Sequence, residues 1–226
     1  ARRMPTLLPP LSVEEALETT KIRSVAGKVG AERGLLSQRP FRAPHHMTSQ
    51  VALIGGGQSP QPGEVSLAHN GVLFLDELPE FGRSVLEVLR QPLEDKKIMV
   101  SRARYSVEYP ANFTLVAAMN PCPCGFYPDM NRCRCTSGEI THYLGKISQP
   151  LLERIDICTE VPAVSFSKMK KKIAGESSAQ IRKRVEAVQE IQRERYKKEK
   201  FCFNGELDGR KLEKYCVMTG GADKLL

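Results

Sequence analysis

The sequence predicts an α/β fold built on a parallel β-sheet, and three short stretches carry this prediction. Residues 71–75 (GVLFL) and 115–119 (LVAAM) are apolar runs of strand length, and each is followed by polar residues. Residues 155–161 are expected to form a third strand. Short apolar runs are typical of strands that are buried on both faces of a parallel sheet. We therefore expect helices on both faces of this sheet.

Length and composition limit the classes of protein to which the chain can belong. Its 226 residues can bury one core and part of a second domain. Hydrophobic residues make up 41% and charged residues 27%, which is typical of a globular protein. We see neither a secretory signal nor an apolar run of the roughly 18 residues that a membrane span needs, so we expect a cytoplasmic protein without a membrane partner. The net charge of +8 is compatible with a polyanionic partner but does not require one.

A helix and a long loop are expected before the first apolar run. Ser12 is a typical helix N-cap, and the acids that the helix dipole favours follow it at Glu14 and Glu15. Residues 38–69 are rich in Pro and Gly and are expected to form a long inserted loop, which in a compact domain is usually functional. His45 and His46 could ligate a metal, but adjacent residues do not face the same way. A packed or phosphate-facing role is therefore favoured.

A second helix and a β-hairpin are expected between the two apolar runs. Apolar residues lie on one face of a helix over residues 83–91, and Pro92 is expected to end it. Residues 96–109 alternate between apolar and polar side chains, which predicts a hairpin with a basic tip around Arg102 and Arg104.

The last part of the chain has a different composition. Residues 163–175 read as a linker, and Ser177 with Gln180 has the spacing of a capping box at the start of a helix that continues to about residue 200. The basic residues on its other faces either lie in solvent or contact nucleic acid. A shorter helix is expected over residues 208–218.

Two acids follow the first apolar run directly. Asp76 and Glu77 would lie at the carboxyl edge of the sheet, where open α/β folds bind their ligands. In nucleotide hydrolases such carboxylates hold Mg²⁺ or orient the attacking water. The alternative is a core strand that ends in two solvated acids.

Four of the seven cysteines lie close together in the sequence, in two C-x-C pairs. Four thiolates within such a short segment can close a tetrahedral Zn²⁺ site, although C-x-C is tighter than the usual spacing of two to four residues. Free buried thiols or a disulfide are the alternatives. The predicted ligands in this cluster, residues 122–135, are Cys122, Cys124, Cys133 and Cys135.

The order of these parts resembles that of the AAA+ ATPases. Among them, it resembles the branch in which a hairpin is inserted before the sensor strand. This branch includes magnesium-chelatase ATPase subunits. The sequence is similar over nearly its whole length to the magnesium-chelatase-like ComM family of bacterial competence proteins. The stretches that carry the resemblance are RPFRAPHH (39–46), VALIGGG (51–57), GEVSLAHNGVLFLDELPEF (63–81), VLRQPLED (88–95), AAMNPCPCG (117–125) and PLLERIDI (150–157).

The resemblance implies roles for single residues. Asp76 and Glu77 would be the Walker B pair, with Asp76 serving Mg²⁺ and Glu77 polarising the water. Asn120 would be the sensor that orients this water or contacts the γ-phosphate. Arg154 would be an arginine finger that acts on the nucleotide of a neighbouring subunit. The alternative for Arg154 is an ion pair with Glu153 or Asp156.

The resemblance also implies the cofactors, the partners and the missing parts. ATP and Mg²⁺ would be the cofactors, a homohexamer the assembly and DNA the substrate of a helicase or branch-migration motor in natural transformation and recombination. DNA phosphates would contact the hairpin at Lys96, Lys97, Arg102 and Arg104. A magnesium-chelatase-type ATPase and a non-hydrolysing module that binds zinc or nucleic acid are the alternatives.

One family motif is absent from the sequence. There is no G-x-x-x-x-G-K-[ST] phosphate-binding loop, so we expect a fragment of a larger ATPase that is inactive alone. Residues 1–162 would form a partial AAA+ core that lacks one strand. Residues 163–226 would form the linker and part of a helical lid.

Overall fold

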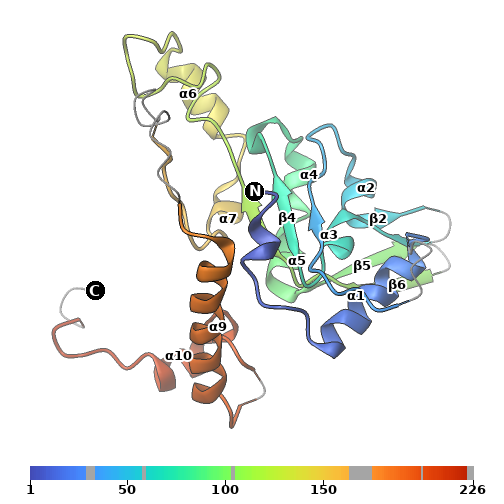
Figure 1. Ribbon diagram of the computed structural model, residues 1–226. Helices are drawn as coiled ribbons and strands as arrows, with labels where there is room; N and C mark the ends of the chain where they lie inside the picture. Colours follow the sequence, from blue (N-terminus) through green and yellow to red (C-terminus); the bar gives the residue numbers. More distant parts are fainter. Residues whose placement is uncertain (29–33, 58–59, 103–104, 163–174, 200, 223–226) are drawn as a thin grey trace. The chain divides into compact units, whose positions relative to one another are not determined.

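Two units make up the chain in the computed structural model (Figure 1). The α/β unit comprises Ala1–Pro5 and Pro10–Ile173, and the helical unit comprises Thr6–Pro9 and Ala174–Leu226. The structure describes residues 1–28, 34–57, 60–102, 105–162, 175–199 and 201–222, without the side chains of Arg102 and Tyr105. Arg104 and most of the predicted linker lie outside these residues.

A parallel sheet with the strand order β1-β4-β7 forms the centre of the α/β unit. Its strands are β1 (Phe41–Arg42), β4 (Val72–Leu75) and β7 (Thr114–Ala117). Leu73 and Leu75 are fully buried, as the apolar run predicted. Burying each such side chain contributes about 1.5–3 kcal/mol. The α/β fold class with a parallel sheet flanked by helices is confirmed (Figure 1).

A close backbone approach explains the glycine at the start of β4. A Cβ added to Gly71 would lie 2.1 Å from the carbonyl oxygen of Pro40. The same oxygen accepts a hydrogen bond of 2.8 Å from the N–H of Val72. Gly71 therefore allows β1 and β4 to pair at this register.

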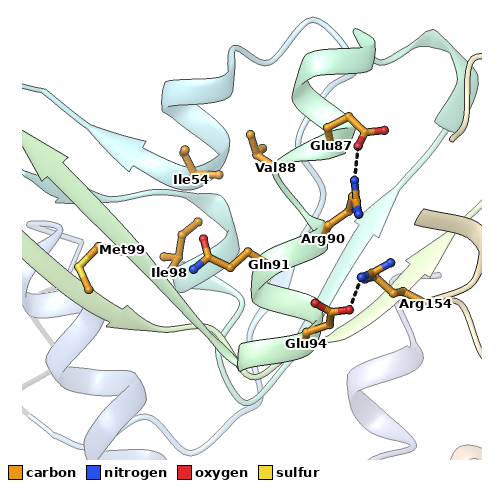
Figure 2. A pocket seen from close by; sticks show the side chains of 9 residues that line it. All are labelled: Ile54, Glu87, Val88, Arg90, Gln91, Glu94, Ile98, Met99 and Arg154. Carbon is orange, nitrogen blue, oxygen red and sulfur yellow. Dashed lines mark hydrogen bonds and ion pairs between the residues drawn. The ribbon is translucent and has the colours of Figure 1, made fainter. Parts of the chain in front are cut away.

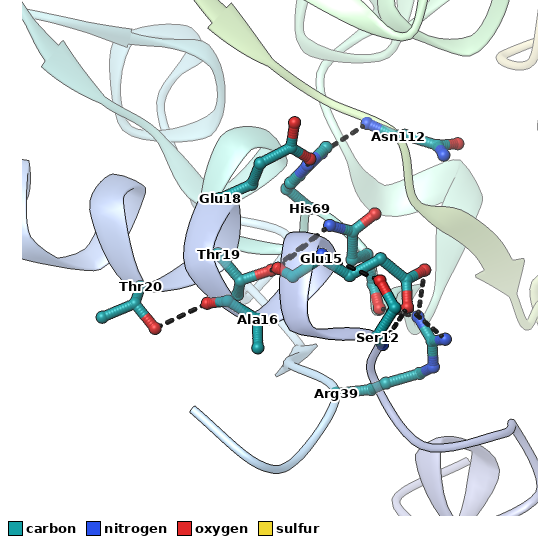
Figure 3. Close-up of polar contacts among 10 residues, drawn as sticks. Ser12, Glu15, Ala16, Glu18, Thr19, Thr20, Arg39, His69 and Asn112 are labelled. Atoms are coloured by element: carbon teal, nitrogen blue, oxygen red, sulfur yellow. Dashed lines mark hydrogen bonds and ion pairs between the residues drawn. The ribbon is translucent and has the colours of Figure 1, made fainter. Parts of the chain in front are cut away.

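Helix α1 (Val13–Val25) begins as the sequence predicts, with a capping box between Ser12 and Glu15. A polar network joins it to the start of β4 (Figure 3). The guanidinium of Arg39 donates to Glu15 and to the carbonyl oxygen of Asn70. His69 Nε2 lies 3.1 Å from Glu18, and its Nδ1 accepts from the backbone N–H of Asn112.

The prediction of a long loop over residues 38–69 is wrong in one respect, because these residues form regular structure besides β1. Its elements are α2 (Gln50–Ile54), β2 (Gly55–Gly56), β3 (Gln61–Pro62) and α3 (Glu64–Leu67). Strands β2 and β3 pair antiparallel. The short elements are anchored by buried side chains at Leu53, Val65 and Leu67, which the high Pro and Gly content obscured.

Pro92 does not end the second predicted helix. The chain forms η2 (Leu78–Glu80), then α4 (Arg83–Glu87), and then α5 (Arg90–Asp95), which contains Pro92 in its first turn. The first backbone N–H groups of a helix have no intrahelical acceptor, so proline is tolerated there. The proline thus belongs to a new helix.

The predicted hairpin is present as β5 (Lys97–Arg102) and β6 (Tyr105–Pro110). The side chains of Ile98, Val100 and Tyr109 form a small buried cluster on one face. The Tyr109 hydroxyl donates to the carbonyl oxygen of Pro60, a hydrogen bond of 2.8 Å. The alternating pattern therefore identified both the strands and their buried face.

The third strand predicted over residues 155–161 is not formed. Ile157 and Val161 are 81% and 87% exposed, and none of the described strands lies beside this segment. A strand needs hydrogen-bonding neighbours, and an apolar sequence alone does not supply them. Two helices before it were not predicted, α6 (Ser137–Leu144) and α7 (Gln149–Leu152).

The helical unit is built on α9 (Ser178–Arg195), with the predicted capping box between Ser177 and Gln180. The structure ends this helix five residues earlier than predicted, and η3 (Asn204–Glu206) and α10 (Gly209–Tyr215) follow. Tyr196 is buried between Phe201 and Tyr215, with ring centroids 4.7 and 5.0 Å away. None of the helices that the structure describes is long and apolar enough to cross a bilayer.

Candidate functional site

The carboxyl ends of β4 and β7 bring three of the predicted site residues to one edge of the sheet. Leu75 pairs with Ala117 in the parallel register, so Asp76 and Glu77 leave β4 where the chain runs from β7 toward Asn120. The N–H of Leu78 donates to the carbonyl oxygen of Ala118, which ties the two strand ends together at 3.0 Å. All three side chains are exposed. The edge is therefore open to a ligand.

Glu77 adopts a left-handed backbone conformation, with φ 54° and ψ 49°. Few residues other than glycine do so, and such a conformation costs about 1–3 kcal/mol. The N–H of Glu77 donates to Oδ1 of Asp76 at 3.1 Å, which supports the turn. Backbone strain of this kind is concentrated at functional sites.

The carboxylate of Glu77 has a partner that the sequence analysis did not identify. Nδ1 of His46 lies 3.0 Å from Oε2 of Glu77. The His46 ring also packs against the rings of His45 and Phe81, with centroids 4.1 and 6.4 Å away. Because β1 is parallel to β4, the residues that follow β1 emerge at the same edge. The position of the two histidines just after this strand was the available signal.

Asn120 lies beside the first residues of the cysteine cluster. A Cβ added to Gly125, whose φ is +79°, would lie 3.8 Å from Cγ of Asn120. Tyr143 is only 6% exposed, and its hydroxyl lies close to the backbone N–H of Asn120. Burial raises the pKa of Tyr143, and the negative charges of Glu80, Cys122 and Glu77 raise it further. Tyr143 therefore lies near both the strand-end acids and the cluster.

The four predicted metal ligands converge. Their sulfur atoms all lie within 4.8 Å of one another. Cys122 Sγ lies 3.4 Å from Cys124 Sγ and 3.8 Å from Cys133 Sγ, and the last two are 3.6 Å apart. Thiolates bound tetrahedrally at a Zn–S distance of about 2.3 Å would be about 3.8 Å apart. The arrangement therefore fits a single tetrahedral ion.

Backbone groups around the cluster also favour thiolates. The N–H of Tyr127 donates to the sulfur of Cys122 at 3.4 Å. A hydrogen bond from the backbone of Phe126 lowers the pKa of Cys124 to about 6. Metal ions bind the thiolate and not the thiol. Backbone hydrogen bonds also lower the pKa values of Cys133 and Cys135, but burial and the neighbouring thiols raise them overall, that of Cys135 to about 12. The agreement of chemistry with geometry is therefore clear for Cys122 and Cys124.

Arg154, the predicted arginine finger, follows α7 and is engaged within its own chain (Figure 2). Its guanidinium forms an ion pair with Glu94 of α5 and donates to the carbonyl oxygen of Pro150. The ion-pair partner is thus neither Glu153 nor Asp156. Nε of Arg154 is buried and has no hydrogen-bond partner among the described atoms.

The guanidinium of Arg154 borders a shallow pocket of about 410 Å³ (Figure 2). Nε of Arg90, on the same pocket, is also buried without a partner among the described atoms. The pocket is lined by Ile54, Glu87, Val88, Arg90, Gln91, Glu94, Ile98, Met99 and Arg154.

Three of the four predicted basic residues of the hairpin lie in its described part, at opposite ends. Lys97 pairs with Glu108 at 2.9 Å, and Lys96 donates to the carbonyl oxygen of Leu93 at 3.0 Å. Both lie at the base of the hairpin, where Lys97 is opposite Pro110. Arg102 ends β5 at the other end of the hairpin. Lys96 and Lys97 therefore lie at the opposite end of the hairpin from Arg102.

Comparisons with known proteins agree with these features. Residues 1–169 match the family described as magnesium chelatase, subunit ChlI, and residues 175–226 match its C-terminal family. YifB of Salmonella typhimurium is 48% identical over 96% of the chain, and the competence protein ComM of Haemophilus influenzae is 46% identical over 97%. The chain spans 42% of the length of each of these relatives.

A more distant relative is the magnesium-chelatase 38 kDa subunit of Chlorobaculum parvum. It is 32% identical over 32% of the chain and 21% of its own length. The family match covers the sheet, both strand ends, the hairpin and the cysteine cluster. The chain belongs to the magnesium chelatase subunit ChlI family.

Proposed function

We propose that the chain is part of a ring-forming AAA+ ATPase that hydrolyses ATP with Mg²⁺ and acts on DNA as a helicase or branch-migration motor. The observation that carries this proposal is the parallel pairing of β4 with β7, which brings Asp76, Glu77 and Asn120 to one sheet edge. Similarity to a competence protein supports a role in the uptake and recombination of DNA. Residues 163–226 would contribute to the helical lid of the AAA+ core.

The three strand-end residues would divide the work in hydrolysis. Asp76 is exposed and would hold Mg²⁺, directly or through water. Glu77 would orient the attacking water, and the contact with His46 would keep its carboxylate in one position. Asn120 would orient the same water or contact the γ-phosphate. The Mg²⁺ ion would neutralise the charge that develops on the phosphate oxygens.

Arg154 would act in the neighbouring subunit's site. Its ion pair with Glu94 holds it in its own chain, so this pair would have to open when a subunit interface forms. An arginine finger is worth roughly 10³–10⁵ in turnover because it stabilises charge in the transition state.

The test of the ATPase proposal uses a full-length protein that contains this chain. Glu77→Gln should retain ATP binding and lose turnover, because it removes only the charge that orients the water. Arg154→Ala should also bind ATP and lose turnover. Mixing the two variants should restore activity, since some interfaces then pair an intact Glu77 with an intact Arg154. No recovery, with subunit exchange shown independently, would reject the finger.

The proposed contact with DNA phosphates lies in the β5–β6 hairpin. Arg102→Ala with Arg104→Ala should weaken DNA binding and lower its salt slope by about 0.9 for each phosphate that the hairpin no longer neutralises. Lys96→Ala with Lys97→Ala is the matched control for charge. Its effect should be smaller, because both ammonium groups already have partners within the chain. If DNA binding and its salt slope are unchanged in the arginine variant, the hairpin is an ordinary edge hairpin that does not contact DNA phosphates.

A chelatase-type ATPase that drives Mg²⁺ insertion into a porphyrin is the second candidate. The matched family and the 38 kDa subunit of Chlorobaculum parvum favour it. ATPase activity that requires a tetrapyrrole would support this function, whereas stimulation by DNA would support the motor. A non-hydrolysing module that binds zinc or nucleic acid would hydrolyse ATP under neither condition.

We also propose that the four clustered cysteines hold one structural Zn²⁺ ion. Sulfur separations of 3.4–3.8 Å among Cys122, Cys124 and Cys133 support it, because they match the edges of a zinc–thiolate tetrahedron. Elemental analysis of protein purified without chelator should give one zinc per chain. Cys124→Ser should lose the metal, and Cys158→Ser, at an exposed cysteine outside the cluster, should retain it. Untreated protein without metal would contradict the proposal.

A further inference from the structure

The cysteine cluster closes an excursion of the chain over residues 121–135, which begins directly after Asn120 of the candidate ATPase site. Cys122 lies two residues after Asn120, and Cys135 directly precedes Thr136, the N-cap of α6. Sulfur atoms from the two ends of this excursion, Cys122 and Cys133, are 3.8 Å apart. An ion bound by all four sulfurs would fix the residues just after Asn120 relative to the start of α6.

Helix α6 then returns the chain to the strand end. Thr136 and Glu139 form a capping box, with the Thr136 N–H donating to Glu139 at 2.7 Å, so the helix direction is fixed at its first turn. Tyr143, near the end of the helix, is buried, and its hydroxyl lies close to the backbone N–H of Asn120. Lys146, just after the helix, lies 3.6 Å from Glu80 of η2. The end of the helix therefore lies close to Asn120, and Lys146 after it contacts the turn that follows Glu77.

The side chain of Asn120 also lies close to the excursion. It lies over Gly125, whose positive φ turns the backbone between the two pairs of cysteines. Asn120 thus lies close to the backbone at Gly125 on one side and to the hydroxyl of Tyr143 on another. The positions of both neighbours depend on the path of residues 121–135.

Burial of apolar side chains does not hold this path. Residues 121–135 are all described, and among them only Cys122 is buried. Phe126 and Met130 are 40% and 75% exposed, and Phe126 is covered in part by the guanidinium of Arg132, 4.0 Å from its ring centre. The converging sulfurs are therefore the main feature that could fix the excursion.

We propose that the metal-loaded cysteine cluster and Tyr143 together position Asn120 at the ATPase site. The four cysteines and Tyr143 act as positioning residues, because none of them needs to touch the nucleotide. This inference rests on the ATPase function proposed above. It predicts that loss of the metal impairs the same step as loss of the Asn120 amide.

A double-variant cycle in the full-length protein tests this coupling. The Asn120→Ala variant measures the loss of kcat that removal of the side-chain amide causes. Cys124→Ser should lose the metal and lower kcat by about tenfold or more, the scale at which displaced supporting contacts impair a site. ATP affinity should change less than about twofold, because the change affects one orienting group only. Cys124→Ser with Asn120→Ala should be no slower than Asn120→Ala, since both changes remove one interaction.

Three matched variants separate positioning from a general structural effect. Cys124→His keeps a zinc ligand and should retain the metal and most of kcat. Cys158→Ser removes an exposed thiol outside the cluster and should change nothing. Tyr143→Phe keeps the buried ring but removes the hydroxyl, so it should lower kcat and keep the metal.

A readout that does not depend on turnover is amide hydrogen exchange at Asn120. Removal of the metal, or Tyr143→Phe, should speed exchange there while β4 stays protected. Metal loss with unchanged kcat and unchanged exchange at Asn120 would overturn the inference and leave the ATPase proposal intact. If the wild-type protein does not hydrolyse ATP, the proposed function fails, and the exchange experiment still decides whether the cluster positions Asn120.

Discussion

The central sheet and the cysteine excursion are neighbours in the sequence, but different forces hold them. In the sheet, Leu73 and Leu75 are fully buried, in a core that includes residues from Leu53 to Leu151. In the excursion over residues 121–135, only Cys122 is buried. The sheet can therefore fold by removing apolar surface from water, whereas the excursion depends on cross-linking of its sulfur atoms. The contrast indicates that different treatments should unfold the two regions.

Removal of the metal should give the largest effect. Structural zinc contributes an apparent 10–16 kcal/mol in small zinc domains, which sets the upper limit here. In the full-length protein, a chelator should bring amide exchange in residues 121–135 close to that of an unfolded peptide. The amides of β4 and β7 should remain protected. Identical exchange in the excursion with and without chelator would show that other contacts hold it.

Leu73→Ala should give the second effect, and in the opposite region. The change removes a fully buried side chain and should cost about 2–5 kcal/mol, through reduced burial and a residual cavity. Amide exchange should become faster in β1, β4 and β7, and the metal content should stay at one equivalent. Loss of the metal from this variant would mean that the two regions are not held independently.

His69 should make the stability of the α/β unit depend on pH. Burial lowers its pKa below the ordinary value of 6.5, against the influence of Glu18 and Glu15. Below pH 6.5 the unfolded chain therefore binds a proton that the folded chain does not. Stability should be full above this pH and fall as the pH drops toward the lowered pKa. Thermal unfolding between pH 5 and about 7.5 measures this dependence.

A variant assigns that pH dependence to one side chain. His69→Gln should cost about 1–3 kcal/mol at neutral pH, since it disturbs the contacts with Glu18 and the N–H of Asn112. It should also flatten the acid side of the profile. His142→Gln, at an exposed histidine, is the matched control. An unchanged profile in the His69 variant would assign the pH dependence to other groups.

Met130→Ala should have the smallest effect. Met130 is an apolar residue of the excursion, but its side chain is 75% exposed. Surface substitutions of this kind change stability by less than about 0.5 kcal/mol. The thermal midpoint, the zinc content and the exchange of residues 121–135 should all be unchanged. A clear destabilisation would show that apolar contacts also hold the excursion.

Local patterns were sufficient to predict the sheet, the hairpin and several helix starts. The apolar runs predicted β4 and β7, alternation predicted β5 and β6, and the Ser12 N-cap and the Ser177 capping box predicted two helix starts. The convergence of four sulfurs was also predicted from the C-x-C pairs. In each case the chemistry that decides the structure lies within a few residues.

The sequence predictions were wrong or incomplete where residues far apart in the sequence determine the structure. Residues 155–161 resemble a buried strand but have none of the described strands beside them, so they form no regular structure and most of them are exposed. Pro92 breaks a helix only when it follows the first turn, and α5 begins just before it. The contacts of His46 with Glu77 and of Arg154 with Glu94 join residues far apart in the sequence, which no local pattern reveals.

The position of the hairpin between two paired strands has a consequence for the order of folding. Val72 must find Thr114 across a long stretch of chain, and closing such a loop costs entropy that grows with its length. The β5–β6 hairpin lies within that stretch and brings Lys97 next to Pro110 through local contacts alone. Local hairpins form within microseconds, before non-local parallel strands pair. An early hairpin would shorten the search of β7 for β4, so weakening it should slow folding more than it lowers the final stability.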